Sequence, residues 1–435
     1  MDYLAAWMFL AMTVLLMAGF PVSFTLLGVS LAFGLAGFGW DFFNLLPLRI
    51  WGVMSNFTLT AVPLFIFMGM TMERSGIATK LIEAAGMLLG RLHGGMAVAV
   101  VAVGALLGAS TGIVGATVVT MGLLALPPML RAGYSHSLAT GAIAASGTLG
   151  QIIPPSIVLV LLGDIIGVPV GQLFVSAVVP SLLTVALYIL FILVYAALQP
   201  KAAPAIADLR RQSGGSPILE LLRALVPPLV LIMAVLGSIF AGIASPTEAA
   251  GVGAIGALLL SIGMGRFSLD MLKQVMDSTT RLTAMIFTIL VGATAFGLVF
   301  RGLGGDMLVR DFIGSLPFGP AGALFIIMAV IFVAGFFLDF VEITFIHIPV
   351  VAPIMIEMGF DPAWLAVIFA LNLQTSFLTP PFGFSLFYLK GVCPDSVSTL
   401  SIYKGIIPFV ILQLVVLALV ATFPALATWL PAILE

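Results

Sequence analysis

Long apolar stretches separated by short polar turns run along the whole chain. Stretches long enough to cross about 30 Å of hydrocarbon recur from end to end. The most polar segment, QPKAAPAIADLRRQSGGSP at residues 199–217, reads as a linker between two halves. The pattern predicts an all-α polytopic membrane protein with one membrane domain. Its parts are a first half at residues 1–198, a linker at 199–223 and a second half at 224–435.

The second half repeats the first. Matched residues lie 223 positions apart near the start of each half and 226 apart near its end. A slowly drifting separation of this kind, carried by prolines and a tripeptide, indicates a true internal repeat. The matched positions are Gly19 and Gly242, Gly28 and Gly251, Ser55 and Ser278, Leu59–Ala61 and Leu282–Ala284, Gly69 and Gly292, Gly94 and Gly319, Pro127 and Pro353, Gly133 and Gly359, Pro154 and Pro380, and Pro155 and Pro381.

Each half contains two short apolar stretches around a polar centre, which predicts a re-entrant hairpin. In residues 42–70, Ser55, Asn56 and Thr58 lie between stretches of about half a membrane thickness. The matching hairpin is expected at about 268–298, with Ser278, Thr279 and Thr280 at its tip.

A mixed charged and apolar segment follows each predicted hairpin, at about 73–93 and 305–316. Such segments are typical of helices that lie along the membrane interface with their basic residues facing water.

Two prolines in succession interrupt an apolar stretch in each half. GTLGQIIPPS at 147–156 and SFLTPPFG at 376–383 place prolines where no water can replace the lost hydrogen-bond partners. Non-helical backbone is tolerated at membrane depth only where protein buries it or it lines a cavity. We therefore expect broken helices at about 137–164 and 363–393, each forming part of a binding site.

Freed carbonyls and nearby hydroxyls are hard oxygen ligands that suit an alkali cation, and helix N-termini suit a carboxylate. The sequence predicts one cation site in each half and a substrate site beside them. The first cation site is Ser55, Asn56, Ser146, Gly147, Thr148 and Pro154; the second is Ser278, Thr279, Asn372, Thr375, Ser376 and Thr379; the substrate contacts are Thr58, Thr280, Pro155, Pro380 and Pro381. In the competing interpretation the prolines only kink packed helices, and the hydroxyls bond back to their own helices.

Ionisable residues in apolar surroundings are a further clue. Asp339 and Glu342 are functional candidates by position, yet their spacing also fits a capping box at a helix start. Both interpretations of Asp339 stay open. Glu248 follows Ser245 and a proline, which favours capping, and His347 is expected to be a packing residue.

Composition and charge narrow the classes of function. Hydrophobic residues make up 62% of the chain and charged residues 8%, and the net charge of −2 gives no reason to expect a nucleic acid partner. One cysteine, Cys393, and three scattered histidines give no disulfide and no zinc spacing. The first apolar run lacks a basic start and a cleavage pattern, so we expect a retained helix.

Basic residues in the linker set the expected orientation. Lys201, Arg210, Arg211 and Arg223 outnumber Asp208 and Glu220, which predicts a cytoplasmic linker. If each half crosses the membrane an odd number of times, the two halves are inverted relative to each other and the N-terminus is periplasmic.

Several motifs together resemble the large membrane (M) subunit of tripartite ATP-independent periplasmic (TRAP) transporters. They are AASGTLGQIIPPSIVLVLLG, LNLQTSFLTPPFGFSLFYLKGV, LTAVPLFIFMG, GIASPTEAAGVGAIGAL and IEMGFDPAWLAVI. The resemblance covers essentially the whole chain. It implies a bacterial or archaeal inner-membrane symporter that works as an elevator, a mobile domain moving against a scaffold, with sodium as the coupling ion and no other cofactor.

The same resemblance implies two protein partners: a small four-helix membrane (Q) subunit, expected as a separate chain, and a periplasmic binding (P) protein that delivers an organic acid. It places sodium at the two predicted cation sites and favours a role for Asp339. The sequence around Asp339 looks closer to 2-oxo acid, lactate or mannitol systems than to sialic acid ones.

Three other functions stay open. A stand-alone carboxylate symporter of the divalent anion type shares the plan of hairpins and broken helices and needs no binding protein. A channel also tolerates re-entrant loops. A membrane enzyme ranks last, because the chain has no HExxH or GxSxG motif.

Overall fold

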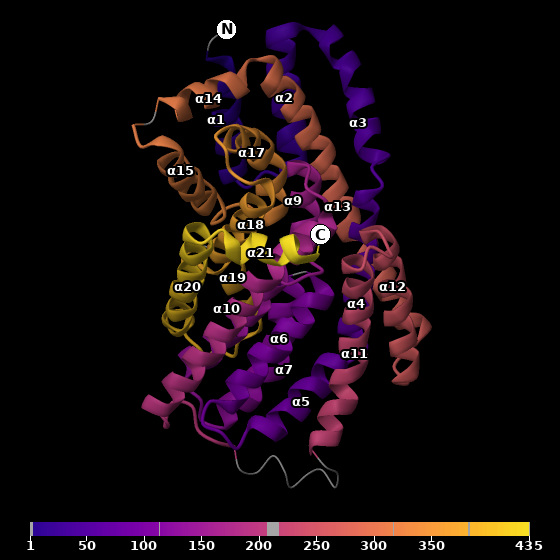
Figure 1. Ribbon diagram of the computed structural model, residues 1–435, viewed down its shortest axis with the longest axis vertical. Coiled ribbons are helices and arrows are strands. Elements are labelled where there is room, and N and C mark those ends of the chain that lie inside the picture. The colour runs from indigo at the N-terminus through magenta and orange to yellow at the C-terminus, as the bar shows by residue number, and fades with distance from the viewer. Residues whose placement is uncertain (1–2, 113, 207–216, 316, 382, 435) are drawn as a thin grey trace.

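The computed structural model describes residues 3–112, 114–206, 217–315, 317–381 and 383–434 (Figure 1). Over these residues the chain folds into helices and contains no strand. Six helices are long and apolar enough to cross a membrane, or up to eight if each of two bent pairs is one span. The predicted all-α polytopic membrane class is confirmed.

Helices of the first half have counterparts in the same order in the second. The first half contains α1 (Leu4–Met17), α2 (Val22–Phe38), η1 (Trp40–Leu45), α3 (Leu46–Met54), η2 (Thr58–Thr60), α4 (Ala61–Arg74), α5 (Ile77–Leu89), α6 (Gly95–Thr111), α7 (Val114–Arg131), α8 (His136–Thr148), η3 (Leu149–Gln151), α9 (Ile157–Ile166) and α10 (Val170–Leu198). The second half contains α11 (Pro217–Phe240), α12 (Pro246–Gly263), α13 (Leu269–Gly302), α14 (Gly305–Gly314), α15 (Gly319–Ala334), α16 (Phe340–Ile346), α17 (Ile348–Glu357), α18 (Pro362–Leu378), α19 (Phe384–Val392) and α20 (Thr399–Thr422), followed by α21 (Ala425–Leu434).

Backbone conformation supports the repeat. Three glycine pairs matched by sequence have a left-handed backbone in both halves: Gly19 and Gly242 (φ 86° and 67°), Gly94 and Gly319 (77° and 64°), and Gly133 and Gly359 (86° and 96°). This region of φ is open to glycine and costly for residues with a Cβ. Sequence identity at these positions therefore reflects the same turns at the same places.

Neither segment expected to be the re-entrant hairpin folds back on itself. Residues 40–74 form a first arm, η1 to α4, that bends by 58° around residues 55–57 and continues onward. Residues 269–302, the second arm, are one continuous helix of 34 residues, α13. Both hairpin predictions are wrong. The polar residues at 55–58 mark a bend, and those at 278–280 lie on the face of an unbroken helix.

The two arms lie side by side and run in opposite directions (Figure 1). Arg74, at the end of α4, donates a hydrogen bond to Gln274 near the start of α13. At the other end, Gly302 closes α13 against the rings of Phe38 and Phe42. Packing is also reciprocal, because α2 packs against α13 and α12 packs against α4.

The segments that turn back are the next ones along the chain. Helices α6 and α7 pack against each other and turn at Gly112, whose φ of 59° ends α6 in a left-handed cap. In the second half the corresponding segment is α15 followed by α16 and α17, which bend by 55°. We call residues 110–112 and 335–339 the two tips. Sequence patterning missed them because each lies between apolar stretches with little polar contrast.

The expected interfacial segments are short helices, α5 at 77–89 and α14 at 305–314. Their position relative to a membrane stays a prediction. Residues 199–206 of the linker are held against the first half, because Ala203 accepts from Gly94 N and Ala202 accepts from Ser135 N, both at 2.9 Å. Residues 207–216 of the predicted linker, with Asp208, Arg210 and Arg211, lie outside the described residues, and α11 starts at Pro217.

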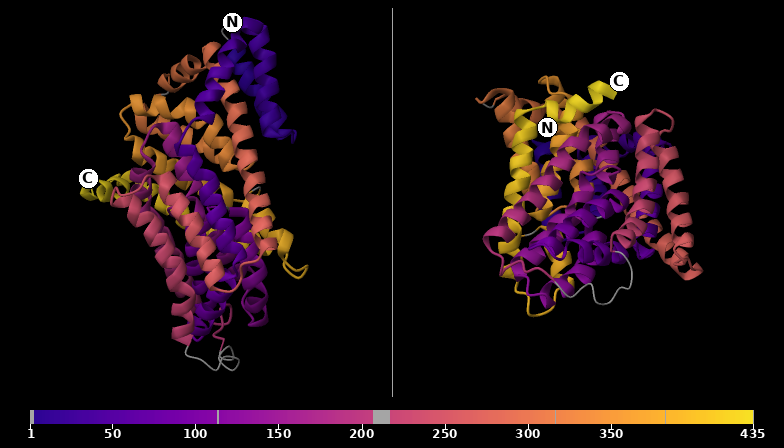
Figure 2. Two further views of the ribbon diagram at one scale, coloured as in Figure 1. Left: turned by 90° about the vertical axis from the view of Figure 1, so that its right-hand side faces the viewer. Right: turned by 60° about the horizontal axis from the view of Figure 1, so that its bottom comes forward.

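Helices α1 to α3 lie toward one end of the long axis, and the end of α10 and the start of α11 lie at the other (Figures 1 and 2). The first apolar run forms helix α1. Between the ends, α8, α9 and α18 contain the most continuously buried positions of the described chain. The broken helices are therefore the core of the molecule.

Candidate functional site

Both double-proline motifs interrupt a helix. In the first half α8 ends at Thr148, the turn η3 follows, and residues 152–156 are non-helical before α9 begins. In the second half α18 ends at Leu378 and α19 begins at Phe384. Both Pro–Pro peptide bonds are cis. Two half-helix ends thus meet at each break, deep in the protein.

The hydroxyls of the predicted cation ligands that lie at the breaks donate back to their own helices. Ser146 donates to Ile143 O and Thr148 to Ala145 O, both at 2.9 Å. In α18 the hydroxyls of Thr375, Ser376 and Thr379 donate to Leu371 O, Leu373 O and Thr375 O at 2.7, 2.9 and 2.7 Å. This is the back-bonding of the competing interpretation. It uses only the hydroxyl proton, so the oxygen lone pairs stay available to a cation.

Asn372, also a predicted cation ligand, uses the nitrogen of its side-chain amide in a contact with another helix. Its amide nitrogen donates to Met328 O of α15 at 2.9 Å, which ties the broken helix to the second hairpin. Gly147 packs against Val118 of α7, where a Cβ would collide with the valine side chain. Each broken helix is therefore fastened to the hairpin of its own half.

The tips, rather than the arms, lie on the breaks. Gly108 approaches the backbone of Gly150 so closely that a Cβ would not fit, and Gly112 lies against Ile157 at the start of α9. In the second half Gly335 leaves no room for a Cβ beside Ser376. Small residues at or beside the tips therefore let the hairpin backbone approach the broken-helix backbone in the first half and the Ser376 side chain in the second.

The residues predicted at the hairpin tip of the first half lie elsewhere. Ser55 is exposed at the end of α3 and donates to Trp51 O at 2.8 Å. Asn56 donates to Asp164 Oδ1 at 2.6 Å and accepts from Thr58 N at 3.0 Å. Asp164 is near the end of α9, beyond the break. Because Asn56 bonds to this residue and Ser55 bonds to its own helix, the predicted grouping of Ser55 and Asn56 with Ser146–Pro155 is not found.

In the second half Ser278, Thr279 and Thr280 lie on α13, whose principal packing partners are α2, α3, α4, α14 and α16 rather than the broken helix α18. Pro380 and Pro381 lie at the partly open side of their break, and Pro381 O accepts from the hydroxyl of Tyr403 at 3.0 Å. Pro154 and Pro155 are buried.

A cavity of about 580 Å³ lies between the two hairpins and the two arms. We call it the tip cavity. It brings together α4, the start of α7, α13, the start of α16 and Tyr388 of α19, and its polar lining includes Ser278 and Asp339 from the sequence prediction together with Glu73 and Arg281. The guanidinium of Arg281 pairs only with Asp277 on its own helix, at 2.9 Å, and both side chains are exposed. Such a pair is weak, so Arg281 can bind another carboxylate.

Glu73 links the arm to the first hairpin. Its Oε1 accepts from the hydroxyl of Thr120, on α7, at 2.7 Å. Glu73 and Arg281 are on different halves of the chain, and no local motif marks either. Only the packing of α4 against α13 reveals that they line one cavity.

The structure supplies the capping geometry at Asp339. Asp339 and Glu342 form a capping box at the start of α16, with Glu342 Oε2 accepting from Asp339 N at 3.0 Å. The carboxylate of Asp339 accepts from Phe340 N at 2.6 Å and also lines the tip cavity.

Glu248 forms a capping box with Ser245, as predicted. His347 packs edge-on against Phe9, but its Nδ1 is buried without a hydrogen-bond partner in the described part of the chain.

Two buried amides were not singled out from the sequence. Gln151, in the first break, and Gln374, one turn before the second break, are both fully buried. Neither amide oxygen nor nitrogen has a hydrogen-bond partner among the described residues, and α18 packs against η3. The same described residues contain no group of three or more His, Cys, Asp or Glu placed to hold a metal ion.

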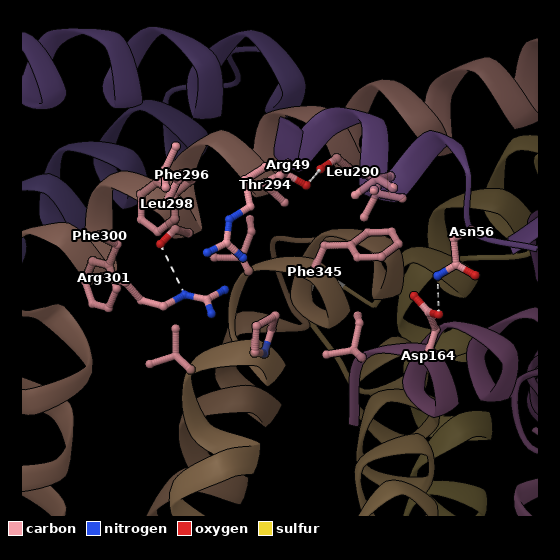
Figure 3. Close-up of a pocket in the computed structure, with 18 of the residues that line it drawn as sticks. Arg49, Asn56, Asp164, Leu290, Thr294, Phe296, Leu298, Phe300, Arg301 and Phe345 are labelled. Carbon is pink, nitrogen blue, oxygen red and sulfur yellow. Dashed lines mark hydrogen bonds between the residues drawn. The ribbon is translucent and has the colours of Figure 1, made fainter. Parts of the chain in front are cut away.

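A second cavity, of about 400 Å³, lies on the other side of α9 and α16 (Figure 3). We call it the arginine cavity, because Arg49 of α3 and Arg301 of α13 line it together with Asn56 and Asp164. On α13, Ile286 lines the tip cavity and Leu290 lines the arginine cavity. Four helical residues rise about 6 Å, so one turn of α13 separates the two cavities.

Comparison with known proteins identifies relatives over nearly the whole chain. Residues 9–426 match the family described as "Tripartite ATP-independent periplasmic transporter, DctM component". A C4-dicarboxylate TRAP transporter large permease protein of Pseudomonas aeruginosa is 30% identical over 93% of each chain. A sialic acid TRAP transporter large permease protein of Vibrio cholerae is 29% identical over 96% of each chain. An ectoine/5-hydroxyectoine large permease protein of Ruegeria pomeroyi is 29% identical over 98% of each chain.

Among solved structures, the YdaH transporter of Alcanivorax borkumensis, described as having an unusual topology, matches with a TM-score of 0.62. The match covers 89% of this chain and 87% of the other at 14% identity. At that identity the likeness extends to the fold alone.

Proposed function

The chain belongs to the DctM family of tripartite ATP-independent periplasmic transporters, and we propose that it is the large permease subunit of a transporter that imports an organic acid with sodium across the inner membrane. The relatives' names include dicarboxylate, sialic acid and ectoine permeases. The substrates in these three names each carry a carboxylate, whereas the isethionate in the name of another relative carries a sulfonate.

The tip cavity is the observation that carries this proposal. It is lined by both hairpins and both arms, and its polar groups are few and convergent, as expected of a small-molecule site. Arg281 supplies a guanidinium that matches a carboxylate in geometry and charge. The apolar walls, which include Phe340 and Phe377, offer contact to the non-polar part of an organic acid.

Sodium is proposed to bind where each tip meets its broken helix. Ser146 and Thr148 keep their oxygen lone pairs, and the non-helical residues 152–156 add backbone carbonyls, which together are the oxygen-only donors that an alkali cation prefers. Thr375, Ser376 and Thr379 offer the same chemistry in the second half. Because the tips replace the arms at these sites, Ser110 and Thr111 take the place proposed from sequence for Ser55 and Asn56.

Elevator movement is proposed for a body made of α6 to α9 and α15 to α19, which we call the transport core, against the two arms. The antiparallel arms and the reciprocal packing of α2 and α12 support an inverted pair of repeats. Polar contacts between arm and core are few and separate: Asn56 with Asp164, and Glu73 with Thr120. Sparse contacts of this kind allow one body to slide along the other.

Two partners complete the proposed system: a small membrane subunit and a periplasmic binding protein that delivers the acid. The test is reconstitution of all three proteins in vesicles, with uptake of radiolabelled pyruvate, lactate and a C4 dicarboxylate measured with and without an inward sodium gradient. We expect uptake that needs all three proteins and sodium. Uptake by this chain alone would contradict the tripartite function and favour a stand-alone carboxylate symporter.

The sodium site has a matched pair of variants. Thr148→Val removes a hydroxyl at the break, and Thr140→Val removes a hydroxyl that bonds back to the same helix two turns earlier. We expect Thr148→Val to raise the sodium concentration for half-maximal uptake about tenfold, the cost of losing one ligand contact worth about 1.4 kcal/mol, while Thr140→Val leaves it unchanged. Equal sodium dependence in both variants would exclude Thr148 as a ligand.

A further inference from the structure

The arginine cavity contains two arginine side chains that are not part of the substrate site proposed in the tip cavity. Figure 3 shows the side chains of Arg49 and Arg301 directed into one space, from α3 and from the end of α13. Two guanidinium groups that face the same space repel each other unless an anion lies between them. The space between the two guanidinium groups is therefore a place of positive potential.

Neither guanidinium forms a close ion pair among the described residues. The only ion pairs of the described residues are Arg281 with Asp277 and Arg310 with Glu357. Arg301 donates from Nε to Gly297 O at 3.3 Å, and the four N–H bonds of its terminal nitrogens have no acceptor among the described residues.

Two carboxylates, Asp164 and Asp306, also line the cavity, and neither forms an ion pair with Arg49 or Arg301 in the described part of the chain. Asp164 accepts the amide of Asn56 at 2.6 Å. Burial raises the pKa of Asp306, although Arg301 and Arg310 lower it, so its charge couples to both arginines without a close ion pair. Figure 3 shows Asp164 beside Asn56, away from the space between Arg49 and Arg301.

We propose that Arg49 and Arg301 form a second anion site, which binds the carboxylate of a small organic acid on the side of the core opposite the tip cavity. A guanidinium fork matches a carboxylate with two parallel hydrogen bonds, and Phe345 and Phe296 provide apolar walls. The site lies one turn of α13 from the tip cavity, so an acid held there is next to the transport path. That role in transport rests on the proposed function; the binding chemistry does not.

The test relies on the chain having a single cysteine, which can be replaced so that an introduced cysteine is the only thiol. Cys393→Ser gives a chain without thiols, and Thr294→Cys then places one thiol in the arginine cavity. The modification rate is compared for two methanethiosulfonates of similar size, one with an anionic sulfonate and one with a cationic trimethylammonium. We expect the anionic reagent to be favoured by about fivefold or more, a modest effect for two charges at this range in water, and pyruvate or succinate to slow it.

Arg49→Gln with Arg301→Gln should abolish the preference, whereas Arg223→Gln, an exposed arginine of α11, should leave it unchanged. If Thr294→Cys does not fold, Gly52→Cys is the second reporter, because open space surrounds Gly52 in the same cavity.

A preference that is absent, or that survives loss of both arginines, would overturn the proposal. So would protection by phosphatidylglycerol vesicles but not by carboxylates, because the site would then bind a lipid phosphate. Modification needs no transport, so this result is separate from the uptake test of the proposed function.

Discussion

The two arms are repeats of each other in sequence, yet the first bends and the second is one straight helix. Both contain Leu-Thr-Ala, at 59–61 and at 282–284, preceded by a serine at the same spacing. Four positions after Leu59 the first arm has Pro63, and the matched residue of the second arm is Ile286. A proline at that position cannot donate to the carbonyl of Leu59 and would clash with it in a continuous helix.

The bend creates contacts that the straight arm lacks. It frees the side chain of Asn56 to bond Asp164 at 2.6 Å and the carbonyl of Phe57 to accept from Thr247 of α12 at 3.0 Å. The matched residues Ser278 and Thr279 stay on the surface of α13, where Ser278 lines the tip cavity. The bend thus lets the first arm form polar contacts with both α9 and α12, which the face of a continuous helix would not form.

Placing a proline in the straight arm should have the largest effect. Ile286→Pro removes a hydrogen bond in the middle of α13 and should destabilise the protein by about 3 kcal/mol or more, with loss of uptake. Thermal unfolding in detergent and uptake in vesicles measure the two effects. Ile286→Val is the control, because it keeps the helix at a cost of about 1 kcal/mol. A stable, active Ile286→Pro variant would show that α13 does not need to be continuous.

Removing the proline from the bent arm should have a smaller effect. Pro63→Ile restores the donor, so residues 55–60 should spend more time helical and the bond between Asn56 and Asp164 should weaken. Hydrogen exchange of peptides that cover the bend should slow by about tenfold, since protection follows the free energy of local opening. Unchanged exchange there would mean that tertiary contacts, and not Pro63, maintain the bend.

Coupling between Asn56 and Asp164 should be smaller again. Hydrogen bonds to charged groups are worth about 1.5–3 kcal/mol, and partial exposure reduces this one, so a double-mutant cycle with Asn56→Ala and Asp164→Ala should give a coupling energy of about 1 kcal/mol. Unfolding free energies of the four proteins measure it. Additive effects would remove this contact from the arm–core junction.

The smallest effect is expected at Ser55, which the sequence pattern ranked beside Asn56. Its hydroxyl is exposed and bonds only to backbone carbonyls of α3. Ser55→Ala should change stability by less than about 0.5 kcal/mol, as surface substitutions generally do, and should leave sodium dependence as in the parent. A large shift in sodium dependence would show that Ser55 is part of a cation site.

Local signals in the sequence predicted the broken helices correctly. The double prolines at 154–155 and 380–381 mark both breaks, because two prolines in succession remove two helix donors whatever the tertiary context. The hairpins were predicted wrongly. A serine or asparagine among apolar residues looked like a tip, whereas the real first tip depends on a left-handed Gly112, which hydropathy does not reveal.

A single sequence could not predict which polar side chains meet in each cavity. Glu73 and Arg281, or Arg49 and Arg301, come from opposite halves of the chain and meet only because α3 and α4 pack against α13. The sequence analysis did not single out Asp164, and its partner Asn56 was assigned to the break instead. Long-range packing decides these pairs, and no spacing encodes it.

Movement of the transport core against the arms is the central claim, and bridging the two bodies tests it most directly. In the Cys393→Ser background, Glu73→Cys and Thr120→Cys place thiols on α4 and α7, where the parent side chains are hydrogen-bonded. Uptake is measured before bridging, after bridging with Hg²⁺ and after release with a thiol; Asn56→Cys with Asp164→Cys is the alternative pair if the first is inactive when reduced. We expect bridging to stop uptake and release to restore it. Full uptake in fully bridged protein would contradict a moving core.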